Sequence, residues 1–246
     1  MTEPSPKIDL SGRVALVTGA SRGIGAAVAK AYAKAGAHVI LTARTTGALE
    51  EVDDAIQAAG GKATIMPLNM LDLDKIDVMG PAIAEKFGRL DIVVGNAAML
   101  GSLTPLGHVD AKEWARVMDL NVNANFRLLR TLDPLLRASD AGRVIMVSSS
   151  LAQTPRAYWG AYAVSKAALE TLAKVYAAET ATTPMRVNLI DPGATRTAMR
   201  AKAYPGEDPS KPKDPEDTVP LFLELASSAC ATHGEVHKVT EKAQAA

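Results

Sequence analysis

A phenol and an ammonium group stand four residues apart in the stretch AYAVSKAAL, at Tyr162 and Lys166. On a helix these two side chains lie on one face, so the cation can stand close to the phenol oxygen. A nearby positive charge favours the phenolate, and we expect the pKa of Tyr162 to fall from its ordinary value of about 10. A phenol tuned in this way can donate and accept a proton in catalysis. The spacing alone equally suits a packed tyrosine and a lysine that reaches past it to water, so the rest of the chain must decide.

The composition of the chain restricts the kind of protein that carries this pair. Its 246 residues are 48% hydrophobic and 22% charged, which is typical of a globular protein with an ample core. Lysine plus arginine equals aspartate plus glutamate at 27 each, so no net field attracts nucleic acid or an anionic membrane. The single cysteine, Cys230, excludes an internal disulfide and fits a reducing compartment.

No stretch of the sequence suggests a leader or a membrane span. Residues 1–12 are polar, and no later run approaches the ~20 apolar residues that a membrane helix needs. We therefore expect a cytoplasmic protein whose partners are small molecules or further copies of itself.

Short apolar runs alternate with longer helical stretches along the chain. The runs have strand length and are mostly continuous in apolar residues, which is typical of strands buried on both faces of a sheet. Six strands are predicted, at residues 13–18, 38–42, 63–68, 91–95, 143–148 and 185–190, and the tail keeps a plausible last strand. The repeated order of strand, helix and strand requires right-handed crossovers. The sequence therefore predicts an α/β protein with a doubly wound, Rossmann-like parallel sheet and helices on both of its faces.

Two helices carry clear boundary signals. Apolar residues repeat at helical spacing between the first two strands, and Gly36 ends that helix. Asp214 followed by Pro215 is typical of the first positions of a later helix.

No linker or change of composition divides the chain. We expect one dinucleotide-binding domain over residues 1–246, with a flexible start at 1–9 and a tail at 240–246. The Pro-rich segment 200–215 is either a substrate flap or a loose connection.

A glycine cluster, TGASRGIG at residues 18–25, follows the first strand directly and opens the first helix. Gly19, Gly23 and Gly25 allow a ligand to approach the backbone closely, and the N–H groups and dipole of a helix start favour negative charge. A tight turn from strand to helix also needs glycine, and this spacing departs from the G-x-G-x-x-G fingerprint. The position in the first βαβ unit nevertheless favours a dinucleotide pyrophosphate here.

The charge at the end of the second strand distinguishes between two dinucleotides. An acidic residue there binds the ribose 2′-hydroxyl of NAD, whereas an arginine suits the 2′-phosphate of NADP. In this chain Arg44 takes the position, Arg22 lies in the glycine loop, and the next acidic residue is Glu50. Two guanidinium groups can bind one phosphate. We therefore expect NADP(H) in preference to NAD(H), with two solvated arginines as the alternative.

Together these features resemble the short-chain dehydrogenase/reductase family, in its compact single-domain branch. The resemblance covers about residues 10–238 and depends on several motifs in the right order. They are TGASRGIG at 18–25, GNAA at 95–98, LNVNA at 120–124, VSSS at 147–150, YAVSK at 162–166 and DPGATRT at 191–197. The resemblance implies an oxidoreductase that interconverts a small-molecule carbonyl and a secondary alcohol by hydride transfer with NAD(P).

The resemblance also implies four catalytic residues, Ser149, Tyr162, Lys166 and Asn121. Tyr162 would supply a proton as negative charge grows on the substrate oxygen, and Ser149 would hold that oxygen by a hydrogen bond. Lys166 would lower the pKa of Tyr162 and hold the nicotinamide ribose hydroxyls. Asn121 would hold a water that links Lys166 to solvent, with a helix amide satisfied by other partners as the alternative. The near misses for the serine position are Ser148 and Ser150.

Matching the family motifs onto the chain selects the residues expected to contact the cofactor. They are Gly19, Ser21, Arg22, Gly23, Ile24, Gly25, Arg44, Asn69, Met70, Asn96, Ala97, Tyr162, Lys166, Pro192, Gly193, Thr195 and Thr197. Within this set Asn96 would lie near the adenosine ribose and Asn69 near the adenine. Thr195 and Thr197 would hold the nicotinamide carboxamide, and a Pro-Gly turn with capping threonines is the alternative.

Three departures from the family pattern affect these expectations. GNAA replaces the usual N-N-A-G and puts the packing of the central strand in question. Asn69 stands where an aspartate is common, which should alter an adenine contact. The end of the chain lacks the usual Asp-Gly-Gly, a segment that often helps to assemble tetramers, so a homodimer and a homotetramer both stay open. Self-association is expected through the helices within 110–138 and 160–178.

The sequence does not identify the substrate. The residues expected on the pocket floor are mostly apolar or aromatic and favour a hydrophobic or ring-bearing compound: Leu100, Leu151, Gln153, Tyr158, Trp159 and Met199. His233 and His237 lie in a turn and strand, where residues four apart are too distant to chelate, so no metal is expected.

Two other functions share parts of this pattern. A dinucleotide-binding sensor or scaffold could use the same fold without chemistry, but it would have no need for a tuned acid. A nucleotide-sugar epimerase shares the Y-x-x-x-K pair, but such enzymes normally carry an extra substrate domain for which this chain is too short.

Overall fold

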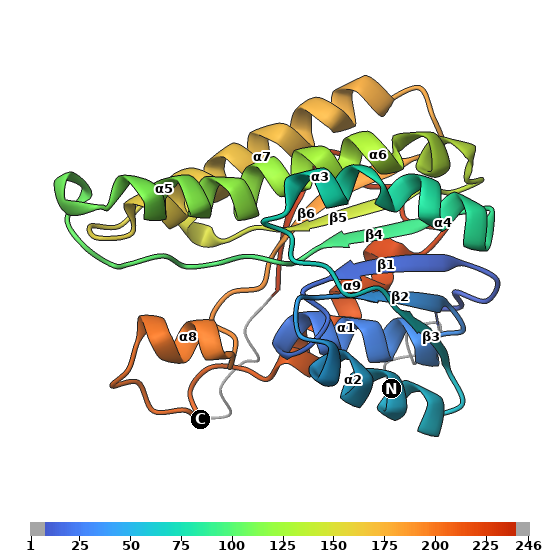
Figure 1. Ribbon diagram of the computed structural model, residues 1–246, viewed down its shortest axis with the longest axis horizontal. Helices are drawn as coiled ribbons and strands as arrows, with labels where there is room; N and C mark the ends of the chain where they lie inside the picture. Colours follow the sequence, from blue (N-terminus) through green and yellow to red (C-terminus); the bar gives the residue numbers. More distant parts are fainter. Residues whose placement is uncertain (1–7, 240–246) are drawn as a thin grey trace, which may run out of the picture.

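The computed structural model describes residues 8–239, and its centre is a parallel sheet of seven strands (Figure 1). The order across the sheet is β3-β2-β1-β4-β5-β6-β7, and neighbouring strands pair in parallel throughout. The strands are β1 (Val14–Thr18), β2 (His38–Thr42), β3 (Lys62–Ile65), β4 (Ile92–Gly95), β5 (Arg143–Val147), β6 (Arg186–Asp191) and β7 (Val236–Lys238). The doubly wound sheet is confirmed, although the third strand ends at Ile65 and not at residue 68.

Helices cover both faces of this sheet (Figure 1). One face carries α1 (Gly23–Lys34), α2 (Thr46–Ala58) and α9 (Val219–Ala226), and the other carries α4 (Met79–Phe87), α6 (Ala124–Ala138) and α7 (Gly160–Thr180). The shorter elements are α3 (Leu73–Asp77), α5 (Ala111–Met118), α8 (Ala198–Ala203), the 3₁₀ turns η1 (Leu106–His108), η3 (Ser150–Ala152) and η4 (Pro215–Thr218), and the π-helical turn η2 (Asp119–Asn123). None of the helices described is long and apolar enough to cross a membrane.

The sheet separates two hydrophobic cores, because successive side chains of a strand point to opposite faces. In β1, Ala15 and Val17 point into the core beneath α1, α2 and α9, whereas Val14 and Leu16 point into the core beneath α4, α6 and α7. Both sets are buried, which explains why β1 is apolar at each position from Val14 to Val17. Each fully buried Val or Leu side chain contributes roughly 1.5–3 kcal/mol to folding.

The predicted helix boundaries are present. After α1 ends at Lys34, Gly36 follows with a left-handed backbone φ of 100°. The helix expected after Asp214 begins as the 3₁₀ turn η4 and continues as α9. Its start is a capping box in which the Asp214 N–H donates to the Asp217 carboxylate at 3.2 Å. At the start of the chain, Ile8 already packs against the core, while the predicted flexible or tail residues 1–7 and 240–246 lie outside the described residues.

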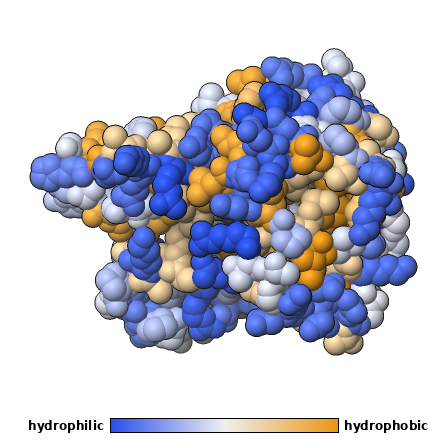
Figure 2. Space-filling model, in the orientation of Figure 1, coloured by the Kyte–Doolittle hydropathy of each residue, from blue (hydrophilic) through white to orange (hydrophobic). Residues whose placement is uncertain are grey.

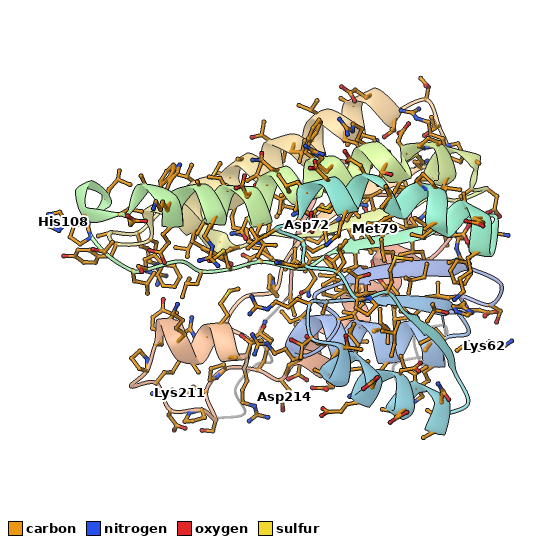
Figure 3. The ribbon with its side chains drawn as sticks, in the orientation of Figure 1. Lys62, Asp72, Met79, His108, Lys211 and Asp214 are labelled. Atoms are coloured by element: carbon orange, nitrogen blue, oxygen red, sulfur yellow. The ribbon has the colours of Figure 1, made fainter. Side chains whose placement is uncertain are left out.

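Residues 195–215, here named the α8 lobe, stand apart from the layers of the sheet (Figures 1 and 3). Three contacts tie the lobe to itself. Thr195 forms a parallel bridge with Lys213, and Arg196 pairs with Asp214. The Nε atom of Arg200 donates to Glu207 at 2.7 Å. These contacts hold the Pro-rich segment in one arrangement against α8.

The sheet has its topological switch point between β1 and β4, which are neighbours in the sheet but far apart in sequence. The chain leaves β1 for the α1 face and leaves β4 for the α6 face (Figure 1). A crevice therefore opens at the carboxyl ends of these strands, where ligands bind in open α/β sheets.

Candidate active site

A cavity of about 1360 Å³ occupies this crevice. Its walls come from the glycine loop, the ends of β2, β4, β5 and β6, the start of α7 and the α8 lobe. Figure 2 shows the surface hollowed between the arm that carries α5 and the α8 lobe. The predicted site residues line this cavity except for two, Gly25 and Asn121. Gly25 packs against the glycine loop, and Asn121 is fully buried behind the cavity wall.

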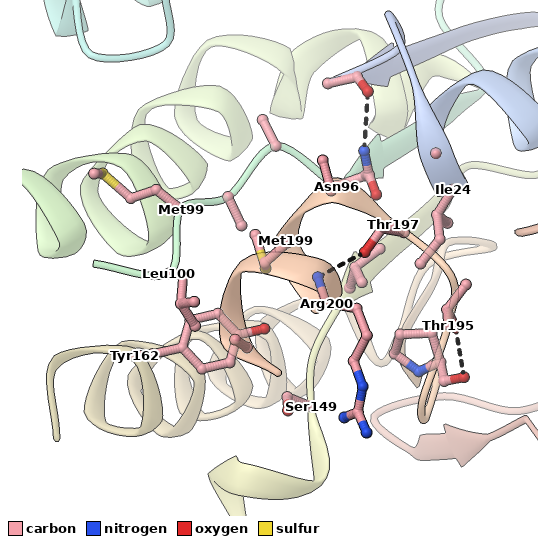
Figure 4. Close-up of a pocket in the computed structure, with 18 of the residues that line it drawn as sticks. Ile24, Asn96, Met99, Leu100, Ser149, Tyr162, Thr195, Thr197, Met199 and Arg200 are labelled. Atoms are coloured by element: carbon pink, nitrogen blue, oxygen red, sulfur yellow. Dashed lines mark hydrogen bonds between the residues drawn. The ribbon is translucent and has the colours of Figure 1, made fainter. Parts of the chain in front are cut away.

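Tyr162 projects from the first turn of α7 into the cavity (Figure 4). Ser149 lies just after β5 and lines the same cavity, and its hydroxyl oxygen accepts from the Leu151 N–H at 3.3 Å. Burial raises the pKa of Tyr162 to about 12; the nearby Ser149 hydroxyl acts to lower it, and the Asp191 carboxylate acts to raise it. The expected fall in the pKa of Tyr162 is therefore wrong for this arrangement, because loss of solvation outweighs the favourable contacts of the phenolate.

Lys166 lies one turn further along the same face of α7, with a buried side chain. Its Nζ atom donates to the carbonyl oxygen of Val147 at 2.6 Å and lies 5.7 Å from the centroid of the Tyr162 ring. Burial lowers the pKa of Lys166 to about 8. The amine is thus anchored to the last residue of β5, beside the segment that carries Ser149.

Asn121 lies in the π-helical turn η2 between α5 and α6. Its Nδ2 atom donates to the carbonyl oxygen of Met99 and to Oγ of Ser165, both at 2.9 Å, and its Oδ1 atom accepts from the Met99 N–H at 2.9 Å. The Asn121 backbone carbonyl accepts from Nδ2 of Asn125 at 2.9 Å. This is the satisfied amide that the sequence left as an alternative: the side chain ties the loop after β4 to α7. A role in holding water stays a prediction.

The glycine loop between β1 and α1 admits a ligand close to the backbone. Gly19 has a left-handed φ of 65°, and a Cβ atom there would lie 2.8 Å from Nδ2 of Asn96. A Cβ atom on Gly25 would collide with the Gly19 carbonyl oxygen. Within residues 8–239, no side chain caps the start of α1 and no acidic residue stands in its first turn. These features fit the pyrophosphate of a dinucleotide.

Two arginines line the cavity where the adenosine end of a dinucleotide would lie. The side chains of Arg22 and Arg44 are exposed, and neither belongs to an ion pair among the described residues. Asn69 and Met70 complete this wall. The Oδ1 atom of Asn69 accepts from the Leu71 N–H at 3.2 Å, which shapes the turn after β3. The two free guanidinium groups fit a phosphate.

The GNAA departure has a local packing explanation. Gly95 pairs with Met146 of β5, and a Cβ atom on Gly95 would lie inside the space of the Met146 sulfur and 2.7 Å from Oδ1 of Asn125. The larger neighbouring side chain thus fills the place that an asparagine would take. Asn96 follows; its Nδ2 atom donates to the carbonyl oxygen of Thr18 at 2.9 Å and to that of Gly19 at 3.3 Å, which ties β4 to the glycine loop.

The DPGATRT segment leads from β6 into the α8 lobe. The Gly193 N–H donates to the Asp191 carboxylate at 3.0 Å, and the Thr195 hydroxyl donates to the Pro192 carbonyl at 3.2 Å (Figure 4). The Thr197 hydroxyl caps α8 by accepting from the Arg200 N–H at 3.2 Å. Both threonines therefore make the capping and turn contacts given as the alternative, and both also line the cavity.

An apolar and aromatic wall stands beside Tyr162. The Trp159 ring lies edge-on to that of Tyr162, with centroids 6.0 Å apart, and is tilted by 39° to that of Tyr204, with centroids 5.7 Å apart. The Arg200 guanidinium group lies over the Tyr204 ring, with its central carbon 3.7 Å from the ring centroid. The remaining apolar residues of this wall are Leu100, Leu151, Met199 and Ala203.

The prediction of the pocket floor was wrong at two positions. Gln153 and Tyr158 are exposed and do not line the cavity. Tyr158 has a left-handed backbone φ of 75°. Tyr204 and Arg200 were missed, since they follow a Pro-Gly turn and only the fold of the α8 lobe brings them beside Trp159.

The histidine near the end of the chain has backbone partners. The Nδ1 atom of His233 accepts from the Val187 N–H at 3.1 Å, and its Nε2 atom lies 2.7 Å from the Ala177 carbonyl oxygen. This residue therefore links β6 to α7, and its contacts are structural.

Comparison with known proteins adds to this geometry. The family model described as short chain dehydrogenase matches residues 13–208. The uncharacterised oxidoreductase YciK of Escherichia coli K12 is 45% identical over 224 residues, which span 89% of this chain and 88% of that protein.

Solved structures share the fold over nearly the whole chain. The structure of the oxidoreductase YciK from E. coli has a TM-score of 0.93 and 40% identity, and the match covers 98% of this chain and 100% of that one. A short chain dehydrogenase from E. coli CFT073, crystallised with NADPH, has a TM-score of 0.91 and 41% identity, with 96% and 99% of the two chains covered.

Proposed function

Because the chain belongs to the short-chain dehydrogenase/reductase family of NAD(P)-dependent oxidoreductases that act on CH–OH and C=O groups, we propose that it reduces a carbonyl compound with NADPH. The observation that carries the proposal is the joint position of Ser149, Tyr162 and Lys166 in the wall of one cavity that the glycine loop also lines. The phenol of Tyr162, the hydroxyl of Ser149 and the glycine loop proposed to bind the dinucleotide thus line one cavity.

Tyr162 is proposed to be the general acid. Its pKa of about 12 keeps the phenol protonated at neutral pH, so it can give its proton to the substrate oxygen during reduction. Ser149, which lines the cavity with Tyr162, is proposed to hold the same oxygen as negative charge develops on it. When bound, NADPH supplies the hydride that makes the new C–H bond at the carbonyl carbon.

Lys166 is proposed to position the reacting groups. Its amine is fixed on Val147 at the end of β5 and faces the cavity, where it would hold the ribose hydroxyls beside the nicotinamide. With a pKa of about 8, it is mostly an ammonium at neutral pH and stabilises the phenolate left on Tyr162 after proton transfer. Asn121 would support this arrangement through its contacts with Met99 and Ser165.

The preference for NADPH over NADH is proposed to come from Arg22 and Arg44. Both are free of ion pairs among the described residues and line the cavity beside Asn69. Their forked guanidinium groups suit the 2′-phosphate, and no acid replaces them at the end of β2 to bind a 2′-hydroxyl. The NADPH complex of the similar E. coli protein supports this choice.

The substrate is proposed to be hydrophobic or ring-bearing. The wall beside Tyr162 consists of Leu100, Leu151, Trp159, Met199 and Tyr204. Aromatic walls of this kind bind flat apolar groups by stacking or edge contacts. The α8 lobe carries two of these residues and is proposed to act as the substrate flap.

We further propose that two or more copies associate through α6 and α7. These helices expose the apolar residues Phe126, Val164 and Val175, each with 44–50% of its surface accessible to solvent. Apolar side chains on adjacent helices are suited to face a second copy.

A substrate screen tests the proposed reaction. The purified protein would be supplied with NADPH and a panel of keto-steroids, quinones, acyl-thioesters and aldehydes, and loss of NADPH would be followed by absorbance. We expect turnover of apolar members of the panel. Turnover confined to small, highly charged compounds would contradict the substrate class, and tight NADPH binding without any turnover would favour the sensor or scaffold function instead.

A further inference from the structure

The end of β5 is fixed by successive contacts with one face of α7. Lys166 donates from Nζ to the carbonyl oxygen of Val147 at 2.6 Å. Tyr162 lines the cavity together with Ser149, which follows Val147 by two residues, and the Ser149 hydroxyl acts to lower the pKa of the Tyr162 phenol. The residue between them is Ser148, which none of the roles proposed above uses.

Ser148 is bound by a third residue of the same helix face. Its Oγ atom donates to Oε1 of Glu170 at 2.6 Å, and both side chains are buried, with exposures of 2% and 5%. Glu170 follows Lys166 by four residues, so it lies one turn further along the face that carries the proposed catalytic groups. Ser148 is also held by its backbone, because its N–H donates to the Ile190 carbonyl at 2.7 Å.

Glu170 is placed behind the site and not in it. Ser148 lines the cavity, whereas Glu170 does not. The second oxygen of Glu170 lies 3.5 Å from Nζ of Lys174, a half-exposed side chain on the outer part of α7. The Glu170 carboxyl group therefore lies between the half-exposed Lys174 and the segment that carries Ser149.

The buried Ser148 hydroxyl needs an acceptor, but a neutral amide would serve as well as a carboxylate at a lower cost of burial. A buried carboxyl group loses hydration, and one short hydrogen bond with one distant cation compensates for this only in part. An apolar residue of similar size would pack between α7 and β5 without that cost. What the acid adds is a directed contact that fixes the Ser148 side chain and, through the backbone, its neighbour.

We propose that Glu170 is a positioning residue, which holds Ser148 so that Ser149 stays within hydrogen-bond reach of Tyr162. The geometric part of this proposal stands on the contacts of Ser148 alone. Its consequence for catalysis rests on the proposed carbonyl reduction.

The geometric part is tested by crystal structures of the wild type, Glu170→Leu and Glu170→Gln. We expect the Ser149 hydroxyl to move away from the Tyr162 phenol in Glu170→Leu and to keep its wild-type position in Glu170→Gln, since the glutamine oxygen still accepts from Ser148. A Glu170→Leu structure with Ser149 unmoved overturns the proposal. If the leucine variant does not fold, Ser148→Ala removes the same contact from the other side and is judged by the same displacement of Ser149.

The catalytic part is tested by kinetics with NADPH and a turned-over member of the carbonyl panel. For Glu170→Leu we expect kcat to fall by about ten- to a hundredfold, because small misplacements of reacting groups have effects of that size. The KM for NADPH should stay within about twofold, since Glu170 does not line the cavity. Glu170→Gln should restore most of kcat.

Two controls separate positioning from general destabilisation. Lys174→Ala removes the cation beside the other Glu170 oxygen and should leave kcat unchanged. The double variant Ser148→Ala/Glu170→Leu should lose no more kcat than the worse single variant, because both act through one contact. Additive losses, or an unchanged kcat in Glu170→Leu, contradict the catalytic part. A wild type that reduces no carbonyl instead contradicts the proposed function, and the crystal structures then decide the geometric part.

Discussion

The Nζ atom of Lys166 lies 5.7 Å from the centroid of the Tyr162 ring, on the same face of α7. Burial acts on both side chains: it raises the pKa of Tyr162 to about 12 and lowers the pKa of Lys166 to about 8. At neutral pH the phenol therefore keeps its proton while the amine is still mostly charged. This protonation state suits a donor in carbonyl reduction, in which the proton leaves the phenol and the remaining phenolate faces a cation.

Because Lys166 is buried and has a lowered pKa, the difference in free energy of unfolding between the wild type and Lys166→Met should depend on pH. Below pH 8 the wild type carries an ammonium in its core, whereas the lysine of the unfolded chain stays protonated up to its ordinary pKa of 10.5. Between these values the folded state gives up its proton first, so the wild type gains free energy of unfolding relative to Lys166→Met as the pH rises. The gain should reach roughly 3 kcal/mol.

Urea unfolding of both proteins from pH 7 to pH 10 measures this difference. Lys174→Met, at a half-exposed lysine of the same helix, is the control and should show almost no pH dependence relative to the wild type. A constant difference between the wild type and Lys166→Met over this range would contradict a buried amine of lowered pKa.

Arg44→Ala should weaken NADPH binding and leave NADH binding unchanged. Hydrogen bonds between a guanidinium and a phosphate are charge-assisted, so the expected loss for NADPH is about ten- to a hundredfold. Fluorescence titration with both dinucleotides measures it. Lys202→Ala, a cation that lines the cavity in the α8 lobe, is the control and should bind NADPH like the wild type. NADH binding as tight as NADPH in the wild type would show that the charge argument is wrong.

Gly25→Ala should displace the glycine loop, because Gly25 packs against its inner side. The added methyl group would collide with the Gly19 carbonyl and lie 2.6 Å from Nδ2 of Asn96, so the loop must shift. We expect a loss of about 1–3 kcal/mol in the free energy of unfolding and a large loss of NADPH affinity. Gly107→Ala, at a position with no atom within 4 Å of the new methyl group, is the matched control. Unimpaired NADPH binding by Gly25→Ala would count against this loop as the pyrophosphate site.

Tyr204→Leu should impair binding of ring-bearing substrates selectively. The Tyr204 ring is held 5.7 Å from Trp159 and beneath Arg200, so its loss removes one aromatic surface from the wall. Aromatic contacts of this kind predict a rise in KM of about two- to tenfold for ring-bearing carbonyls. KM for a short straight-chain aldehyde should not change. Tyr158→Leu, which alters an exposed ring outside the cavity, is the control; equal effects of the two substitutions would exclude a substrate wall at Tyr204.

The strands of the sheet could be predicted because each is buried on both faces, so local hydrophobic runs carry the signal. The run at 38–42 coincides with β2, and that at 143–148 exceeds β5 by one residue. The third run was predicted too long: β3 ends at Ile65, although the N–H groups of Met66 and Leu68 still donate to the Leu41 and Ala43 carbonyl oxygens at 2.9 and 3.0 Å. The residues of the cavity wall were predictable for a related reason: they directly follow strand ends, which parallel pairing brings to one edge of the sheet.

The parts that the sequence did not predict depend on contacts between distant residues. The π-helical turn at Asn121 arises where α5 joins α6, and no local signal distinguishes it from a regular helix. The pKa of Tyr162 depends on how completely the fold buries it, which outweighs the effect that spacing to Lys166 suggested. The contact between Ser148 and Glu170 joins residues 22 apart, and only the packing of α7 on β5 reveals it.

The central claim is that the Tyr162 phenol donates the proton in carbonyl reduction, and Tyr162→Phe tests it most directly. This substitution removes the hydroxyl group and keeps the ring against Trp159. With a carbonyl that the wild type reduces, we predict a fall in kcat of at least about a hundredfold, with NADPH affinity within about twofold of the wild type. Tyr158→Phe, at an exposed tyrosine, should keep the full rate. Equal rates of NADPH-dependent reduction in Tyr162→Phe and the wild type would contradict the account.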